Sequence, residues 1–208
     1  MSLTQLRATA ARFNLLQHSF YTRWTAGELS REELQAYAGE YHHVAAAMPG
    51  WLDQMASQDP AHAPSLRRHA REEAAHVPMW DDFSEALGCD RAALQTSPPN
   101  HATRALLECA DGLVAAGRGA GVMWAVESQA PAVSEAKLAG LRQHYGLDGG
   151  AATRYFEVHT TMDVAHTREL EKLVEAGAPA AGHAEAAELV LRGMFGLLSS
   201  VEHEAVAV

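Results

Sequence analysis

Residues 159–166 read HTTMDVAH, a stretch that places two histidines and one aspartate at positions i, i+4 and i+7. It lies inside a longer segment, residues 151–176, which has a helical apolar period and is followed by a glycine. On an α-helix, which turns by about 100° per residue, His159, Asp163 and His166 lie within roughly 60° of one another. No Lys or Arg within the stretch can neutralise the aspartate. The stretch therefore indicates a helix with one strongly polar face, which is either solvated or binds a metal ion.

The rest of the chain has the same helical character, rich in Ala, Leu, Glu and Arg, with no alternating apolar pattern typical of a strand. Ser30, followed three residues later by Glu33, predicts a capped helix start. Pro78 is expected to kink or break its helix, and Pro131 to interrupt the helix that contains it. We expect seven helices, over about residues 3–18, 30–52, 64–88, 100–116, 120–145, 151–176 and 183–203, with a short helical turn between 88 and 100. The predicted fold class is an all-α helix bundle forming one domain over residues 1–208.

The composition is that of an ordinary soluble globular protein, with 48% hydrophobic and 20% charged residues in a chain of 208. The net charge of −10 argues against a nucleic-acid or anionic-membrane surface, so we expect neither partner. No apolar run approaches the ~20 residues of a membrane span, and the start has no signal-peptide core, which predicts a cytoplasmic protein. The two cysteines lack CxxC spacing and are too few for a disulfide framework. The twelve histidines are many for this length and make metal chemistry worth testing.

Two further polar groups lie on faces that otherwise read as buried. Glu73 and His76 have the ExxH spacing that carboxylate-bridged metal sites use on a helix, with Glu72, four residues before His76, as the competing carboxylate. Glu127 directly follows the apolar run 122–126. A lone glutamate beside such a run is costly to bury unless it is paired or binds a cation.

With the opening triplet, these positions offer three histidines and three carboxylates from three helices. The set contains no thiolate, and mixed imidazole and carboxylate ligation suits iron or manganese better than structural zinc. Three carboxylates can neutralise most of the charge of two divalent cations and leave positions open for O2 and a substrate. Taken singly, each group has another explanation: a solvated or hydrogen-bonded helix face, which the charge run RREE favours for Glu73 and His76, or, for Glu127, a buried salt bridge to an arginine. The histidines interpreted as packing or surface residues are His42, His43, His69, His101, His144 and His183.

The order of these motifs resembles a known family. The segments are HSFYTRWTAGELSREELQAYAGEYHH (18–43), HVPMWDDFSEALG (76–88), ESQAPAVSEAKLAGLRQHYGL (127–147) and RYFEVHTTMDVAHTREL (154–170). Together they resemble the haem-oxygenase-like di-iron oxidases, relatives of the TenA and PqqC proteins, over nearly the whole chain. The branch most similar to them is the CADD-like one. Its members are linked to para-aminobenzoate formation for folate and consume their own side chains as substrate.

This resemblance implies a seven-helix haem-oxygenase-like bundle that acts as a non-haem di-iron oxidase. It also implies two iron ions (manganese remaining open), O2 as co-substrate, an external reductant and a homodimer. It implies that Tyr21 supplies an aromatic ring, that Lys137 donates the amino group, and that Tyr155 lies by the metals. The implied metal ligands are Glu73 or Glu72, His76, Glu127, His159, Asp163 and His166.

The chain also departs from the branch. EEAAH is more compact than the usual spacing between the first Glu and its His, so Glu72 and Glu73 both stay open as ligands. Val126 and His42 stand where the branch usually has tyrosines, at positions expected to line the pocket. Two alternatives therefore remain: a di-iron oxidase of an external small substrate, such as an amino acid or fatty acid, and a metal-dependent hydrolase, which the acidic charge disfavours.

Overall fold

The computed structural model describes residues 3–177 and 181–204, with side chains described as far as residue 202. Within these residues every regular element is a helix, which confirms the predicted all-α fold. The elements in chain order are α1 (Leu3–Arg12), the 3-10 helix η1 (Leu15–Gln17), α2 (Ser19–Ala26), α3 (Arg31–Gln58), α4 (Ala63–Ala86), α5 (Arg91–Thr96), α6 (His101–Ala115), α7 (Gly119–Glu127), α8 (Ala130–His144), α9 (Ala151–His159), α10 (Met162–Ala176) and α11 (His183–Glu204).

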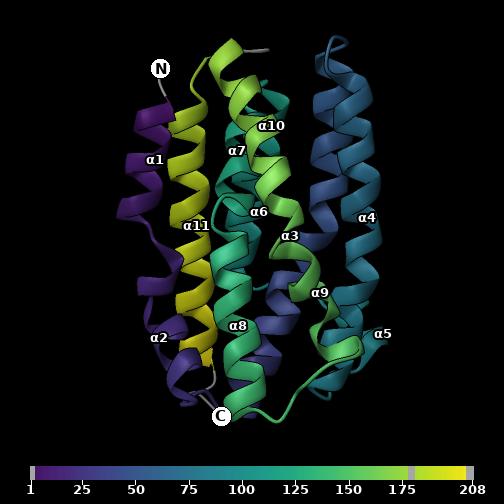
Figure 1. Cartoon of the computed structure of the whole chain (residues 1–208), viewed down its shortest axis with the longest axis vertical. Helices are drawn as coiled ribbons and strands as arrows, with labels where there is room; N and C mark the ends of the chain where they lie inside the picture. The colour runs from purple at the N-terminus through teal and green to yellow at the C-terminus, as the bar shows by residue number, and fades with distance from the viewer. Residues whose placement is uncertain (1–2, 178–180, 205–208) are drawn as a thin grey trace.

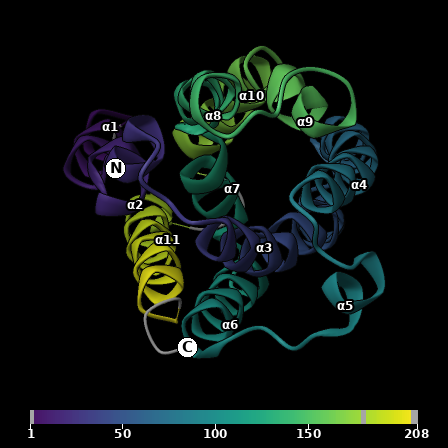
Figure 2. The ribbon, with the colours of Figure 1, turned by 90° about the horizontal axis from the view of Figure 1, so that it is seen from below.

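The longer helices run roughly along one direction and form a bundle (Figure 1). Viewed along that direction, α3, α4, α7, α8, α9 and α10 surround a common centre, whereas α1, α2 and α11 lie together on one side (Figure 2). α4 packs on α3 and α9, and α10 packs on α7. The arrangement therefore brings α4, from the first half of the chain, to the same centre as α7, α9 and α10 from the second half.

The predicted cap at the start of α3 is present. Ser30 accepts a hydrogen bond from the Glu33 amide at 3.2 Å, and the Glu33 carboxylate accepts one from the Ser30 amide at 2.8 Å. The prediction of a helix break at Pro78 was wrong, because α4 continues through this proline to Ala86. A proline inside a helix costs about 3 kcal/mol. We attribute the continuation to packing of α4 on both α3 and α9, which stabilises the whole helix.

Two of the expected long helices are each divided. The helix predicted over 120–145, with an interruption at Pro131, is α7 followed by α8. The break at Ser128 and Gln129 lies just before Pro131, in the first turn of α8, which confirms the expected interruption. The helix predicted over 151–176 is α9 followed by α10, and its break at Thr160 and Thr161 lies inside HTTMDVAH. The angular argument from one continuous helix was therefore wrong, although the three polar side chains of this stretch still share the interior.

The first expected helix is also shorter than predicted, since α1 ends at Arg12 and a 3-10 turn and α2 follow. At the other end of the chain, α11 buries its apolar side chains against α6, α7, α3 and α1 of the same chain. Gly121 permits this packing, because a Cβ there would lie 2.2 Å from the His183 carbonyl oxygen. The apolarity of α11 is thus accounted for within one chain, and the homodimer rests on the family resemblance alone. No helix among the described residues is long and apolar enough to cross a membrane.

Candidate metal centre

Seven ionisable side chains lie together at the centre of the bundle, where α4, α7, α9 and α10 meet. All are almost fully buried, with at most 5% of each exposed. They are His69, Glu73 and His76 from α4, Glu127 from α7, His159 from α9, and Asp163 and His166 from α10. Every residue of the predicted ligand set is among them except Glu72, the alternative to Glu73.

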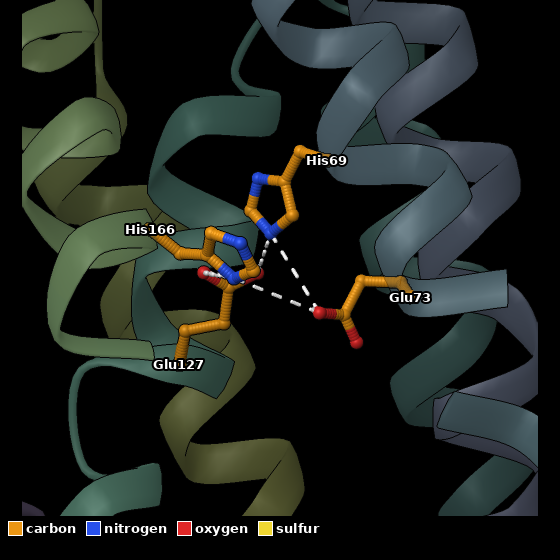
Figure 3. Close-up of side chains that lie close together, drawn as sticks. All are labelled: His69, Glu73, Glu127 and His166. Atoms are coloured by element: carbon orange, nitrogen blue, oxygen red, sulfur yellow. Dashed lines mark ion pairs between the residues drawn. The ribbon is translucent and has the colours of Figure 1, made fainter. Parts of the chain in front are cut away.

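The Glu73 carboxylate lies in the middle of the cluster. Its Oε1 atom is 3.3 Å from His76 Nδ1, 3.7 Å from His166 Nδ1 and 3.8 Å from His69 Nε2. The donor atoms of Glu73, His69, Glu127 and His166 all lie within 4.8 Å of one another, as do those of Glu73, His76 and His159. Figure 3 shows the first group, in which the side chains from α4, α7 and α10 converge. Glu73 is the member common to both groups.

The interior atoms of this cluster have no hydrogen-bond partner among the described residues. They are His69 Nε2, Glu73 Oε1, His76 Nδ1, both carboxylate oxygens of Glu127, His159 Nε2, both carboxylate oxygens of Asp163, and His166 Nδ1. Buried polar atoms are almost always paired, because an unpaired one costs about 1–3 kcal/mol. Divalent cations would pair all of these atoms at once, and imidazole with carboxylate suits iron. The residues present therefore fit the metal ions that the resemblance implies.

The outer nitrogens of two of these histidines are held by the protein. The His159 ring Nδ1 lies 2.5 Å from the Tyr155 carbonyl oxygen, which leaves Nε2 free to face the cluster. The His166 ring Nε2 lies 2.9 Å from Glu72 Oε2, which leaves Nδ1 facing inward. Metal-binding histidines usually have such an outer partner, which fixes the tautomer and the orientation of the ring. Glu72, whose side chain is partly exposed, therefore orients His166 from outside, whereas Glu73 lies inside the cluster.

The cluster shifts the pKa values of its members in opposite directions. Burial raises the pKa of Glu127, and the neighbouring carboxylates of Glu73 and Asp163 raise it further. Burial lowers the pKa of His69 to about 4. Burial would also lower the pKa of His166, but Asp163 and Glu127 raise it to about 9. The raised pKa values of Glu127 and His166 both reflect the crowding of carboxylates around them, a condition that bound cations would relieve.

His69 is the member of the cluster that the sequence interpretation missed, because it was taken as a packing or surface histidine. Its Nε2 atom lies 2.9 Å from Glu127 Oε1, without the geometry of a hydrogen bond. The signal that could have found it is a second copy of the opening pattern. Residues 69–76 read HAREEAAH and residues 159–166 read HTTMDVAH, both with the spacing His-x3-Asp/Glu-x2-His.

A small cavity of about 20 Å³ lies beside the cluster. Its lining includes Tyr21, Lys137, Tyr155 and His159, and the Tyr155 ring stacks on His159 with 4.0 Å between centroids. The three residues singled out by the resemblance thus share one cavity with a histidine of the cluster. Val126 also lines it, as expected.

His42, in contrast, was wrongly expected to line this pocket. Its Nδ1 atom lies 3.0 Å from Asp81 Oδ1, and His42 is not among the residues that line the cavity. The histidine at this position therefore contacts a buried carboxylate and does not form part of the cavity surface.

The Lys137 amine is buried among aromatic rings. Its Nζ atom lies 2.5 Å from the Tyr37 hydroxyl, which in turn lies 3.3 Å from the Tyr21 hydroxyl. Among the described residues no carboxylate pairs with this amine, and burial lowers the pKa of Lys137 to about 7. The backbone also fixes its place, since the Trp24 indole donates to the Lys137 carbonyl at 3.3 Å. At neutral pH about half of this amine is therefore uncharged.

Comparison with known proteins places the chain in a family. The model of the iron-containing redox enzymes matches residues 68–195, which include the whole metal-centre cluster. The 4-aminobenzoate synthase of Chlamydia muridarum is 33% identical over 83% of this chain and 77% of its own length. That of Chlamydia trachomatis is 31% identical over 95% of this chain and 90% of its own.

Among solved structures, a domain with a haem-oxygenase-like fold from Shewanella denitrificans superposes with a TM-score of 0.82. It is 19% identical and covers 99% of this chain and 94% of the other, so it supports the fold alone. The buried imidazole and carboxylate cluster, the matched family model and the two relatives agree with one another. The chain belongs to the iron-containing redox enzymes and is an oxidoreductase with a haem-oxygenase-like fold.

Proposed function

We propose that this enzyme forms 4-aminobenzoate from its own side chains, with Tyr21 supplying the ring and Lys137 the nitrogen. The observation that carries the proposal is the buried amine of Lys137, which has no carboxylate partner among the described residues and is linked through the Tyr37 hydroxyl to the Tyr21 hydroxyl. This arrangement lies in the cavity that reaches His159 of the metal-centre cluster. The names of the two Chlamydia relatives support the choice of product.

The proposal includes two metal ions, iron or manganese, an external reductant and a homodimer. The residues that would hold the metals are Glu73, His76, Glu127, His159, Asp163 and His166, with Glu72 orienting His166. When bound, the metals would supply electrons and open coordination positions for the activation of O2.

The protein residues prepare the two reacting groups. A buried lysine in its neutral form is a nucleophile, and the Tyr37 hydroxyl holds the amine of Lys137 at 2.5 Å. Formation of 4-aminobenzoate requires cleavage of the Cα–Cβ bond and the ring C–O bond of Tyr21. It also requires a new ring C–N bond, cleavage of the Lys137 Nζ–Cε bond, and oxidation of the former Cβ to a carboxylate. The ring oxygen leaves as water, the Cα of Tyr21 takes a hydrogen in place of its side chain, and the Cε of Lys137 is left as an aldehyde. With two O2 as the oxidant, the external reductant supplies two electrons, and a second water molecule is released.

The small size of the cavity favours formation of 4-aminobenzoate from the protein's own side chains over oxidation of an external substrate. About 20 Å³ is space for roughly one water molecule. An aromatic acid or a fatty acid would require the wall, which includes Tyr21 and Tyr155, to move apart. The rings nearest the metal-centre cluster are those of the protein itself, so no substrate has to enter.

The test is to load the protein anaerobically with Fe(II), add reductant and O2, and measure 4-aminobenzoate by mass spectrometry. We expect at most one product per chain, loss of the ring at Tyr21 and loss of the amine at Lys137. Tyr21→Phe and Lys137→Arg should each stop product formation while the iron content stays unchanged. The matched controls are Tyr145→Phe and Lys172→Arg, since neither residue lines the cavity.

Two outcomes would contradict the proposal. If Tyr21 and Lys137 stay intact while O2 is consumed only on addition of a small molecule, the enzyme oxidises an external substrate. If no O2 is consumed in any iron-loaded state, the protein is not an O2-dependent oxidase. The activity to assay is then phosphoester cleavage, the hydrolase alternative.

A further inference from the structure

The metal-centre cluster is built from two segments with the same pattern. Residues 69–76 and 159–166 each place a histidine, a carboxylate and a second histidine at positions 1, 5 and 8, and each ends in Ala-His. The first segment is part of the unbroken α4, and the second spans the break between α9 and α10. Together they supply four histidines, one more than the predicted ligand set contains.

In the structure the two segments pair in a crossed manner. The first histidine of one segment, His69, meets the last of the other, His166, with 3.7 Å between ring centroids. The last histidine of the first segment, His76, meets the first of the second, His159, at 4.5 Å. The four imidazoles therefore form two pairs, and each pair takes one ring from each segment.

The carboxylates complete this division. Glu127 lies at the His69–His166 pair, with Oε1 2.9 Å from His69 Nε2 and Oε2 4.0 Å from His166 Nδ1. The Glu73 carboxylate lies between the pairs, because the same Oε1 atom is near His76, His166 and His69.

His69 is placed as a donor and not as a packing residue. It is 2% exposed, and its Nε2 atom points at the two glutamates with no hydrogen bond formed (Figure 3). A histidine that served only to hold Glu127 would be expected to donate a hydrogen bond to it at this distance.

We propose that His69 is a metal ligand, so that the centre has two positions with two imidazoles each. One position would take His69, His166 and Glu127, and the other His76 and His159, with Glu73 and Asp163 as the remaining carboxylate ligands. The inference rests on the proposed metal centre but does not depend on the formation of 4-aminobenzoate.

The test measures metal binding without turnover. The full-length, metal-free protein is titrated anaerobically with Co(II), and bound metal is followed by its visible absorption and by elemental analysis after desalting. We expect two Co(II) ions per chain in the wild type. His69→Ala should retain one, and the second should bind at least tenfold more weakly.

A second variant and a control separate ligation from support. His69→Gln keeps a side chain that can donate a hydrogen bond to Glu127, so a purely supporting role predicts wild-type binding, whereas ligation predicts the same loss as in His69→Ala. This variant also decides the test if His69→Ala fails to fold. His62→Ala, two turns earlier, is the control, because His62 and His69 line the same cavity of about 210 Å³ and His62 is paired with Asp59 outside the cluster. It should bind two ions as tightly as the wild type.

The failures are distinguishable. If the wild type binds two ions and His69→Gln binds two with affinities within twofold of it, the His69 proposal is overturned whatever His69→Ala does, and the proposed function stands. If the wild type binds no ion, the metal centre is overturned and the proposed function with it.

Discussion

Replacement of Lys137 by methionine should stabilise the metal-free protein, and the gain should depend on pH. Burial lowers the pKa of Lys137 from 10.5 to about 7, so folding at neutral pH works against the protonated amine of the unfolded chain. Methionine has a similar length and no charge, and its thioether packs well against the rings of Tyr37 and Trp80 that surround the amine. The variant therefore removes a cost of folding while it keeps most of the contacts.

The magnitude follows from the two pKa values. A group whose pKa is lower in the folded state binds more protons when unfolded, so its contribution to stability rises with pH between the two values. For Lys137 the cost to folding is about 4 kcal/mol at pH 7 and about 1.5 kcal/mol at pH 9.5. Loss of the hydrogen bond to Tyr37 offsets the gain by about 1 kcal/mol at either pH, so it leaves the difference between the two unchanged.

The assay is urea unfolding of protein kept metal-free with a chelator, at both pH values. Lys137→Met should be more stable than the wild type at pH 7, and the advantage should shrink by about 2.5 kcal/mol at pH 9.5. Lys172→Met, at the exposed lysine, should show no such change. An advantage that is equal at the two pH values would refute the reasoning, because it would mean that the buried amine keeps its ordinary pKa.

The remaining predictions concern the metal centre and the assembly. His159→Ala and His166→Ala should each abolish O2-dependent activity and lower the iron content, with helical circular dichroism retained; full iron loading in either variant would remove that residue from the ligand set. Glu73→Gln should lose bound metal, whereas Glu72→Gln should keep the metal and slow the reaction of the iron-loaded protein with O2 about 10–100-fold, because Glu72 only orients His166; equal losses in the two would contradict the assignment. Light scattering at micromolar concentration should give the mass of a dimer, and a monomer would remove the homodimer from the proposal.

The helical fold was predictable because helix formation depends on local pattern. The capping box at Ser30 and the continuous helical composition each act over a few residues, and both appear in the structure as expected. The break before Pro131 was also predictable, because a proline interrupts a helix locally, whereas the break between α9 and α10 was not. Thr160 and Thr161 are not strong helix breakers, and nothing local in HTTMDVAH requires the chain to bend there. The bend belongs to the tertiary arrangement, in which α9 packs on α4 and α8 while α10 packs on α7.

The site was predictable where several donors have a recognisable spacing, and less so where a residue stands alone. His69 has no spacing signal except through its partners Glu73 and His76, and a single histidine on a helix is more often structural. The choice between Glu72 and Glu73 also required the structure. Two adjacent residues on a helix are about 100° apart, so only the position of the neighbouring helices decides which one is buried.

The two repeated segments show what the local sequence supplies to the metal centre and what the fold must add. Each segment carries its own donors at fixed spacing, but neither can gather enough of them to surround a cation, since its two histidines are seven residues apart. The crossed pairing of His69 with His166 and of His76 with His159 requires α4 to meet α9 and α10 at the centre of the bundle. The same packing excludes water from the carboxylates, which raises the free-energy cost of leaving them uncompensated. The fold therefore both creates the binding positions and makes them unfavourable when empty, and this is the physical reason that metal binding and folding should be linked in this protein.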